Sequence, residues 1–111
     1  MLYMDRLLEL LDKALHGAES GCQTTAKAYL KMARTEWYQL IDEAPPADRD
    51  KFRTAALFID RIVSRQTSLT KAAQVAFDFW TGFEDGWNER TLPGKANAYF
   101  RRGYRYGKEG S

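Results

Sequence analysis

Apolar residues recur at the spacing of one helix face near the start of the chain. Steps of four, three and four residues place them on a single stripe, which predicts a helix over residues 3–16. The helix is expected to end at His16-Gly17, because glycine readily adopts the left-handed conformation that follows a helix. The first stripe comprises Met4, Leu8, Leu11 and Leu15.

A longer stripe follows and predicts a second helix over residues 23–43. Its apolar positions follow the i, i+3, i+4, i+7 pattern of an amphipathic helix. Pro45-Pro46 ends it, because proline lacks an N–H group and clashes with the preceding turn. This second stripe comprises Ala26, Tyr29, Leu30, Ala33, Trp37, Leu40 and Ile41.

Two further helices are predicted over residues 47–65 and 68–89. Pro46, or Ala47 beside it, suits the first turn of the third helix, and Thr67 or Ser68 can cap the start of the fourth. The stripe of the third helix comprises Phe52, Ala55, Ala56, Ile59, Ile62 and Val63. The stripe of the fourth comprises Leu69, Ala73, Ala76, Trp80, Phe83 and Trp87.

Pro93 and Gly94 predict a turn after the fourth helix, and a last helix is expected over residues 95–107. Nowhere does the alternating pattern of a strand appear. Short connections favour antiparallel neighbours, so the sequence predicts an all-α fold, an antiparallel bundle of four or five helices. The 111 residues suffice for one such domain, over residues 1–111.

Positive charge is concentrated at the C-terminal end. Residues 91–111 contain five lysines and arginines against one glutamate, whereas the whole chain has a net charge of +2. Such a segment is typical of a surface that contacts phosphate groups, an acidic protein face or an anionic membrane.

Cys22 is the only cysteine, so no disulfide can form within the chain, and a reducing compartment is expected. Asp5, Arg6 and Glu9 interrupt the apolar N-terminal segment, which argues against a signal peptide. No apolar stretch approaches the length of a membrane span. We therefore expect a cytoplasmic protein that does not contact a membrane.

Few residues suit catalysis or metal binding. The single histidine, His16, is expected near a helix end, and Cys22 lies six residues later with no evident third group to orient the pair. One histidine and one cysteine cannot supply a structural zinc site, and no phosphate-binding loop or dinucleotide fingerprint is present. The sequence predicts no enzyme activity, no catalytic residue, no metal and no cofactor.

Four carboxylates, Asp42, Glu43, Asp48 and Asp50, surround the two prolines. The simplest interpretation is a solvated corner between two helices. The alternative is an acidic docking patch for a basic partner.

Residues 77–108 hold nine of the fifteen aromatic residues, together with two glycine pairs at i, i+4 spacing, Gly82 with Gly86 and Gly103 with Gly107. Glycine inside a helix costs about 0.5–1 kcal/mol relative to alanine, so it indicates close approach of another group. We expect the two glycine-bearing helices to pack together, each pair receiving aromatic rings from the other helix.

The last predicted helix has one side of glycine and aromatic residues and an opposite side that is cationic. Its glycines, Tyr99 and Phe100 share one side. Opposite them lie Arg101, Arg105 and Lys108, with Lys95 and Arg102 on a flank and Tyr104 and Tyr106 near the two boundaries. Arginine beside tyrosine suits a surface that contacts phosphates and stacks on bases, and it equally suits a hot spot of a protein interface. The third interpretation is a solvated basic face that binds nothing. The candidate partner-binding or nucleic-acid-binding residues are Arg90, Lys95, Arg101, Arg102, Tyr104, Arg105, Tyr106 and Lys108.

The segment 83–107 also carries a family resemblance. Its motifs are Phe83-Glu84-Asp85-Gly86-Trp87-Asn88-Glu89-Arg90, then Pro93, then Ala98-Tyr99-Phe100-Arg101-Arg102-Gly103-Tyr104. This arrangement resembles ribosome modulation factor and its phage and plasmid relatives, although the Cys-Pro-Tyr step of that family is missing from the turn. The resemblance implies a pair of helices that faces RNA or a ribonucleoprotein, with Arg90, Arg101, Arg102 and Arg105 as contacts.

The size and the helical, polarised form are also similar to the small inhibitors of phages and mobile elements, including anti-CRISPR proteins. We therefore expect a non-enzymatic binding protein that engages a host protein, a ribonucleoprotein or another nucleic-acid-handling complex in the host cytoplasm. The alternative is a homo-oligomerising module, a homodimer for example, whose interface is the aromatic C-terminal third.

Overall fold

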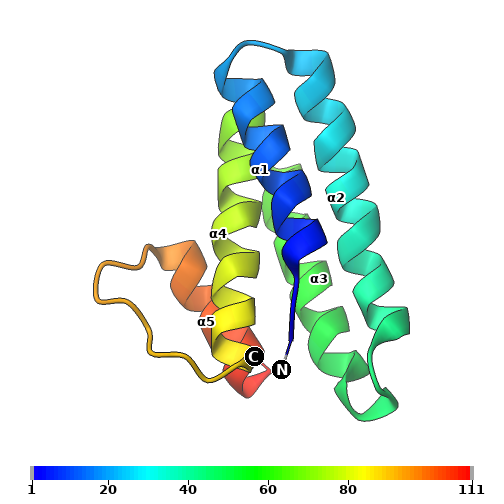
Figure 1. Cartoon of the computed structure of the whole chain (residues 1–111), viewed down its shortest axis with the longest axis vertical. Helices are drawn as coiled ribbons and strands as arrows, with labels where there is room; N and C mark the ends of the chain where they lie inside the picture. Colours follow the sequence, from blue (N-terminus) through cyan, green and yellow to red (C-terminus); the bar gives the residue numbers. More distant parts are fainter. Residues whose placement is uncertain (1, 111) are drawn as a thin grey trace.

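The computed structural model describes residues 2–110, which fold into five α-helices and one short 3-10 turn (Figure 1). The predicted all-α bundle is confirmed. The helices are α1 (Asp5–Glu19), α2 (Gln23–Glu43), α3 (Arg49–Ser64), α4 (Leu69–Trp87) and α5 (Ala98–Glu109), and the 3-10 turn η1 (Pro46–Asp48) precedes α3.

Helices α1 to α4 alternate in direction, and α5 packs on the outside of α4 (Figure 1). In α1 to α4 each helix turns back along its predecessor, as the short connections favour. Helix α5 instead runs parallel to α4. Its direction follows from two contacts: Gly103 lies against Phe79, and Gly107, one turn later, lies against Phe83. The expected antiparallel order therefore does not extend to α5.

The connection between α4 and α5 explains this difference. It covers residues 88–97, and an extended chain spans about 3.3 Å per residue, so it can return along the roughly 18 Å length of a twelve-residue helix. Figure 1 shows this segment as a wide loop beside α4. The composition of the segment predicted a turn, but a turn alone does not fix the direction of the next helix.

The end of α1 also differs from the prediction. The helix continues through Gly17 to Glu19, and Gly21, with φ of 83°, makes the turn into α2. Gly17 is buried, and a Cβ atom built there would lie 3.2 Å from the Ala26 backbone nitrogen of α2. It thus permits close approach of α1 and α2 rather than ending the helix.

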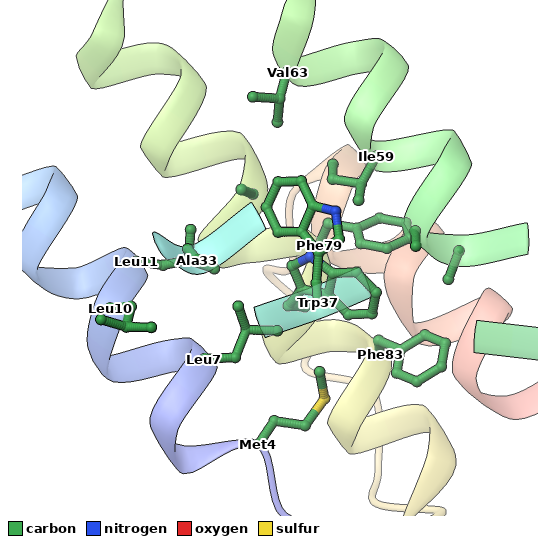
Figure 2. Close-up of a cluster of buried hydrophobic side chains, with 14 of the residues drawn as sticks. Met4, Leu7, Leu10, Leu11, Ala33, Trp37, Ile59, Val63, Phe79 and Phe83 are labelled. Atoms are coloured by element: carbon green, nitrogen blue, oxygen red, sulfur yellow. The ribbon is translucent and has the colours of Figure 1, made fainter. Parts of the chain in front are cut away.

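The core lies between α1, α2, α3 and α4. Its largest fully buried side chains include Trp37 of α2, Ile59 of α3 and Trp80 of α4. The rings of Trp37 and Trp80 lie 6.0 Å apart, and Phe79 and Phe83 extend the aromatic cluster along α4. Figure 2 shows the labelled side chains converging from the four helices. Within the described chain, no helix combines the length and apolar character needed to cross a membrane.

Candidate nucleic-acid interface

The four glycines of the C-terminal third bring the backbones of α4 and α5 into direct contact. A Cβ atom built on Gly103 would lie 1.9 Å from the Phe79 carbonyl oxygen, and one built on Gly82 would lie 2.1 Å from the Phe100 carbonyl oxygen. The predicted packing of the two helices is therefore confirmed. The expectation that these glycines receive aromatic rings is wrong, because they receive the backbone of the opposite helix.

The aromatic rings lie instead beside this contact. The Tyr106 ring packs 5.0 Å from Phe58 of α3 and 5.7 Å from Phe79 of α4, measured between ring centroids. On the other flank, the Tyr104 hydroxyl donates a hydrogen bond to the Arg90 carbonyl oxygen. Both tyrosines lie at the edges of the buried side of α5, as the sequence pattern predicted.

The outward side of α5 is cationic. The glycines of the helix lie against α4 and its tyrosines lie at the edges. Each turn of the remaining surface exposes a basic side chain, and Glu109 is the only carboxylate of α5. We call these residues the cationic face of α5: Arg101, Arg102, Arg105 and Lys108. Lys95 is exposed in the preceding loop.

Three cations of this face, Arg101, Arg102 and Lys108, contact aromatic rings or a carbonyl oxygen. The Arg102 guanidinium lies 5.2 Å from the centre of the Phe58 ring, and the Lys108 ammonium lies 5.7 Å from that of Tyr104. Arg101 donates to the Gly94 carbonyl oxygen at 3.5 Å. Within residues 2–110, no carboxylate forms an ion pair with Arg101, Arg102 or Lys108. Aromatic rings fix such cations without neutralising them.

Arg90 behaves differently from the other candidate residues. Its guanidinium lies 2.7 Å from an Asp85 oxygen and 3.3 Å from a Glu84 oxygen. Hydrogen bonds to Asp85 and Glu84 raise the pKa of Arg90. Nearby carboxylates therefore balance its charge. The Arg90 carbonyl oxygen accepts the hydrogen bond of Tyr104, so the residue lies beside the cationic face of α5 and fixes the loop to that helix.

The two tyrosines also differ in what they can offer a ligand. Tyr106 is half-buried, and its contacts with Phe58 and Phe79 occupy the ring at the junction of α3, α4 and α5. Tyr104 is half-buried as well, and Lys108 covers part of its ring. Of the two rings, that of Tyr104 contacts a cation of this face, Lys108.

Two residues that the sequence pattern does not identify, Glu84 and Asn88, anchor the N-terminal segment to α4. Glu84 is buried, and its carboxylate accepts a hydrogen bond from the Met4 backbone nitrogen at 2.7 Å. The Asn88 side chain exchanges two hydrogen bonds with the Leu2 backbone, at 2.7 and 2.8 Å. A charged residue on the apolar side of the α4 pattern is the signal that could have identified Glu84.

Asn97 fixes the start of α5. Its side-chain oxygen accepts a hydrogen bond from the Phe100 nitrogen at 2.9 Å, and its amide nitrogen donates to Asp78 of α4 at 2.7 Å. The side chain therefore caps the helix and ties its first turn to α4.

Replacing Asn97 with alanine is expected to destabilise the protein by about 1 kcal/mol, the typical cost of losing an N-cap. Amide hydrogen exchange should accelerate at Phe100 and Arg101, in the first turn of α5. Asn97→Ser is the matched control, because serine retains a capping oxygen and should lose less. Equal exchange rates in all three proteins would contradict the capping role.

The other candidate residues lie apart from this face. His16 is exposed and contacts Asp12, one turn earlier in α1, with 3.5 Å between Nδ1 and the carboxylate, and Cys22 is exposed before α2. Glu43 and Asp48, from the acidic corner, line a pocket of about 350 Å³ beside Phe52 and Trp87. Among the described residues, no three His, Cys, Asp or Glu side chains are grouped to hold a metal ion.

No protein-family model, curated protein or solved structure matches this chain at a significant level. The interpretation of the cationic face therefore depends on its own chemistry.

Proposed function

We propose that this protein is a non-enzymatic binding module that holds the RNA of a ribonucleoprotein, or of another nucleic-acid-handling complex, against the cationic face of α5. The observation that carries the proposal is the row of exposed basic side chains on a helix whose backbone is locked against α4. Arginine is well suited to such a surface, because its planar guanidinium can donate two hydrogen bonds to one phosphate.

The rigidity of α5 supports this proposal. A short helix is marginal by itself in water, so a basic segment of this length would order only on binding. Here the glycine contacts with α4 and the Asn97 cap hold α5 in place. Binding then costs little conformational entropy in the protein.

The alternative, an aromatic interface between two copies, has less surface available to it. Phe79, Trp80 and Phe83 are fully buried within the chain. Over residues 2–110, the exposed large apolar residues come from four different segments rather than from the C-terminal third alone. They are Tyr3, Met32, Leu57 and Leu92.

Inhibition of a host CRISPR–Cas complex is one biological role that this binding activity would serve. A small helical module seated on guide RNA would block the path of the target strand. This role depends on the RNA contact, so variants that lose RNA binding should also lose the inhibition.

The proposal is tested by the affinity for a fluorescently labelled single-stranded RNA, measured by fluorescence anisotropy. Arg101→Ala combined with Arg105→Ala should weaken binding at least tenfold. It should also reduce the slope of log affinity against log salt concentration by about 0.7 for each phosphate contact that is lost. The free energy of unfolding should remain nearly unchanged, because exposed charges contribute little to folding.

Arg6→Ala combined with Lys13→Ala is the matched control, since it removes two positive charges from α1, which makes no contact with α5 in the described chain. This control should retain the affinity and nearly the full salt dependence. Equal losses in both double variants would show that net charge alone binds RNA. Unchanged affinity in the α5 variant would refute the proposal.

A further inference from the structure

A second cationic site lies far along the sequence from α5, in a groove between α2 and the turn that joins α3 to α4. The groove has a volume of about 350 Å³, within the range of pockets that bind small molecules. We call it the α2–α4 groove. Its sides are a basic stripe on α2, a set of hydroxyl groups around the turn, and an apolar floor.

The basic side consists of Lys27, Lys31 and Arg34. Their spacing of four and three residues places them on one stripe of α2. Among the described residues, no aspartate or glutamate lines the groove, and neither lysine forms an ion pair. The groove therefore offers concentrated positive charge to a ligand.

Arg34 is held in position from behind. Its guanidinium lies 2.7 Å from an Asp60 oxygen, and the other Asp60 oxygen accepts a hydrogen bond from the Tyr38 hydroxyl at 2.7 Å. Burial raises the pKa of Tyr38, and its hydrogen bond to Asp60 acts in the same direction, so this hydroxyl remains a donor at neutral pH. Asp60, which is not part of the groove lining, orients Arg34 and balances its charge, so the unpaired positive charge of the groove comes from Lys27 and Lys31.

The side opposite α2 carries the hydroxyl groups of Ser64, Thr67 and Ser68. Ser68 caps α4, with its Oγ accepting a hydrogen bond from the Lys71 nitrogen at 3.2 Å. The groove thus adjoins the first turn of a nineteen-residue helix, whose dipole favours negative charge there. Hydroxyl groups and cations on facing sides suit the oxygen atoms of a phosphate.

The floor between these sides is apolar. It comprises Leu30, Val63, Leu69 and Ala72. Inorganic phosphate would leave this floor uncovered, whereas the base of a nucleotide would cover it. We therefore propose that the α2–α4 groove binds a nucleoside monophosphate, with its phosphate between the α2 cations and the start of α4 and its base on the floor. This site is separate from the cationic face of α5, and the inference does not depend on the proposed function.

The test is a nuclear magnetic resonance titration of the isotope-labelled protein with adenosine monophosphate, inorganic phosphate or adenosine. Adenosine monophosphate should give saturable shifts of the amide signals of Ser64, Thr67, Ser68 and Leu69. Its affinity should exceed that of phosphate or adenosine at least tenfold. A short RNA with a 5′-phosphate, added to the Arg101→Ala, Arg105→Ala variant and followed at the same four amide signals, distinguishes the two sources of this chemistry. Tighter binding than the free nucleotide assigns a strand end to the groove, and weaker binding assigns a free nucleotide.

Lys27→Gln combined with Lys31→Gln should lower the affinity for adenosine monophosphate at least tenfold. Both lysines are exposed, so the variant should keep the spectrum of a folded protein. Arg101→Ala with Arg105→Ala is the control and should bind adenosine monophosphate as the wild type does. Shifts spread over all basic segments, equal affinity for phosphate and the nucleotide, or full affinity in the lysine variant would each overturn the inference.

Discussion

Replacing Gly103 with alanine is expected to destabilise the protein by about 3 kcal/mol, at the upper end of the range for overpacking. At an exposed helical position the same change stabilises by about 1 kcal/mol, because glycine is the weaker helix former. Here the added Cβ would lie 1.9 Å from the Phe79 carbonyl oxygen, which is a backbone atom of a packed helix. Helices α4 and α5 would have to move apart, so the sign of the effect reverses.

Urea denaturation followed by circular dichroism measures this change in the free energy of unfolding. Gly94→Ala is the matched control, because a Cβ atom there meets nothing within 4 Å. It should alter stability by no more than about 0.5 kcal/mol. A Gly103→Ala protein as stable as the wild type would show that the two backbones do not touch as described.

Truncation of Trp80 to alanine is expected to cost about 3 to 5 kcal/mol, the range for a large aromatic side chain in a packed core. Trp80 is fully buried, and its ring lies 6.0 Å from Trp37, 5.2 Å from Phe79 and 5.2 Å from Phe83. Its loss would leave a cavity at the centre of the four-helix core. The same denaturation experiment measures the effect.

Trp80→Phe is the informative comparison for this position. The Trp80 indole nitrogen is buried without a hydrogen-bond partner among the described residues. Phenylalanine keeps most of the ring contacts and removes this unpaired donor, so it should cost much less than alanine. Equal losses in the two variants would contradict this account, because they would show that a phenyl ring recovers none of the packing of the indole.

The periodic pattern alone was enough to predict the helices of the bundle. The clearest case is α2, whose predicted range 23–43 coincides with Gln23–Glu43, since Pro45-Pro46 fixes its end. The pattern could not show which glycine makes a turn. Gly17 and Gly21 both lie near the end of α1, and only the packing of α1 on Ala26 distinguishes them.

The direction of α5 relative to α4 could not be predicted from the sequence, for a related reason. Paired glycines predict that two helices approach closely, but the spacing is the same for parallel and antiparallel packing. The loop over residues 88–97 decides between them, and its path depends on contacts far apart in sequence, such as the hydrogen bond of Tyr104 with Arg90.

The sequence predicts the exposure of a candidate residue correctly where its position on a helical face alone determines that exposure. Arg101, Arg102 and Lys108 are exposed as the pattern predicted. Arg90 lies beyond the end of α4, where the chain folds back onto Glu84 and Asp85, so its ion pairs depend on tertiary structure. The sequence pattern does not reveal the α2–α4 groove. In sequence its cations are typical of any solvated helix face, and only the tertiary structure places the α3–α4 turn opposite them.

The measurement that tests the central claim most directly is ultraviolet crosslinking of the protein to bound RNA, followed by mass spectrometry of the crosslinked peptides. Cleavage after glutamate yields the peptide 90–109, which contains the whole of α5. We expect RNA crosslinks on this peptide, and we expect them to decrease strongly in the Arg101→Ala, Arg105→Ala variant. Crosslinks confined to other peptides, or none at all, would contradict the proposal that α5 binds RNA.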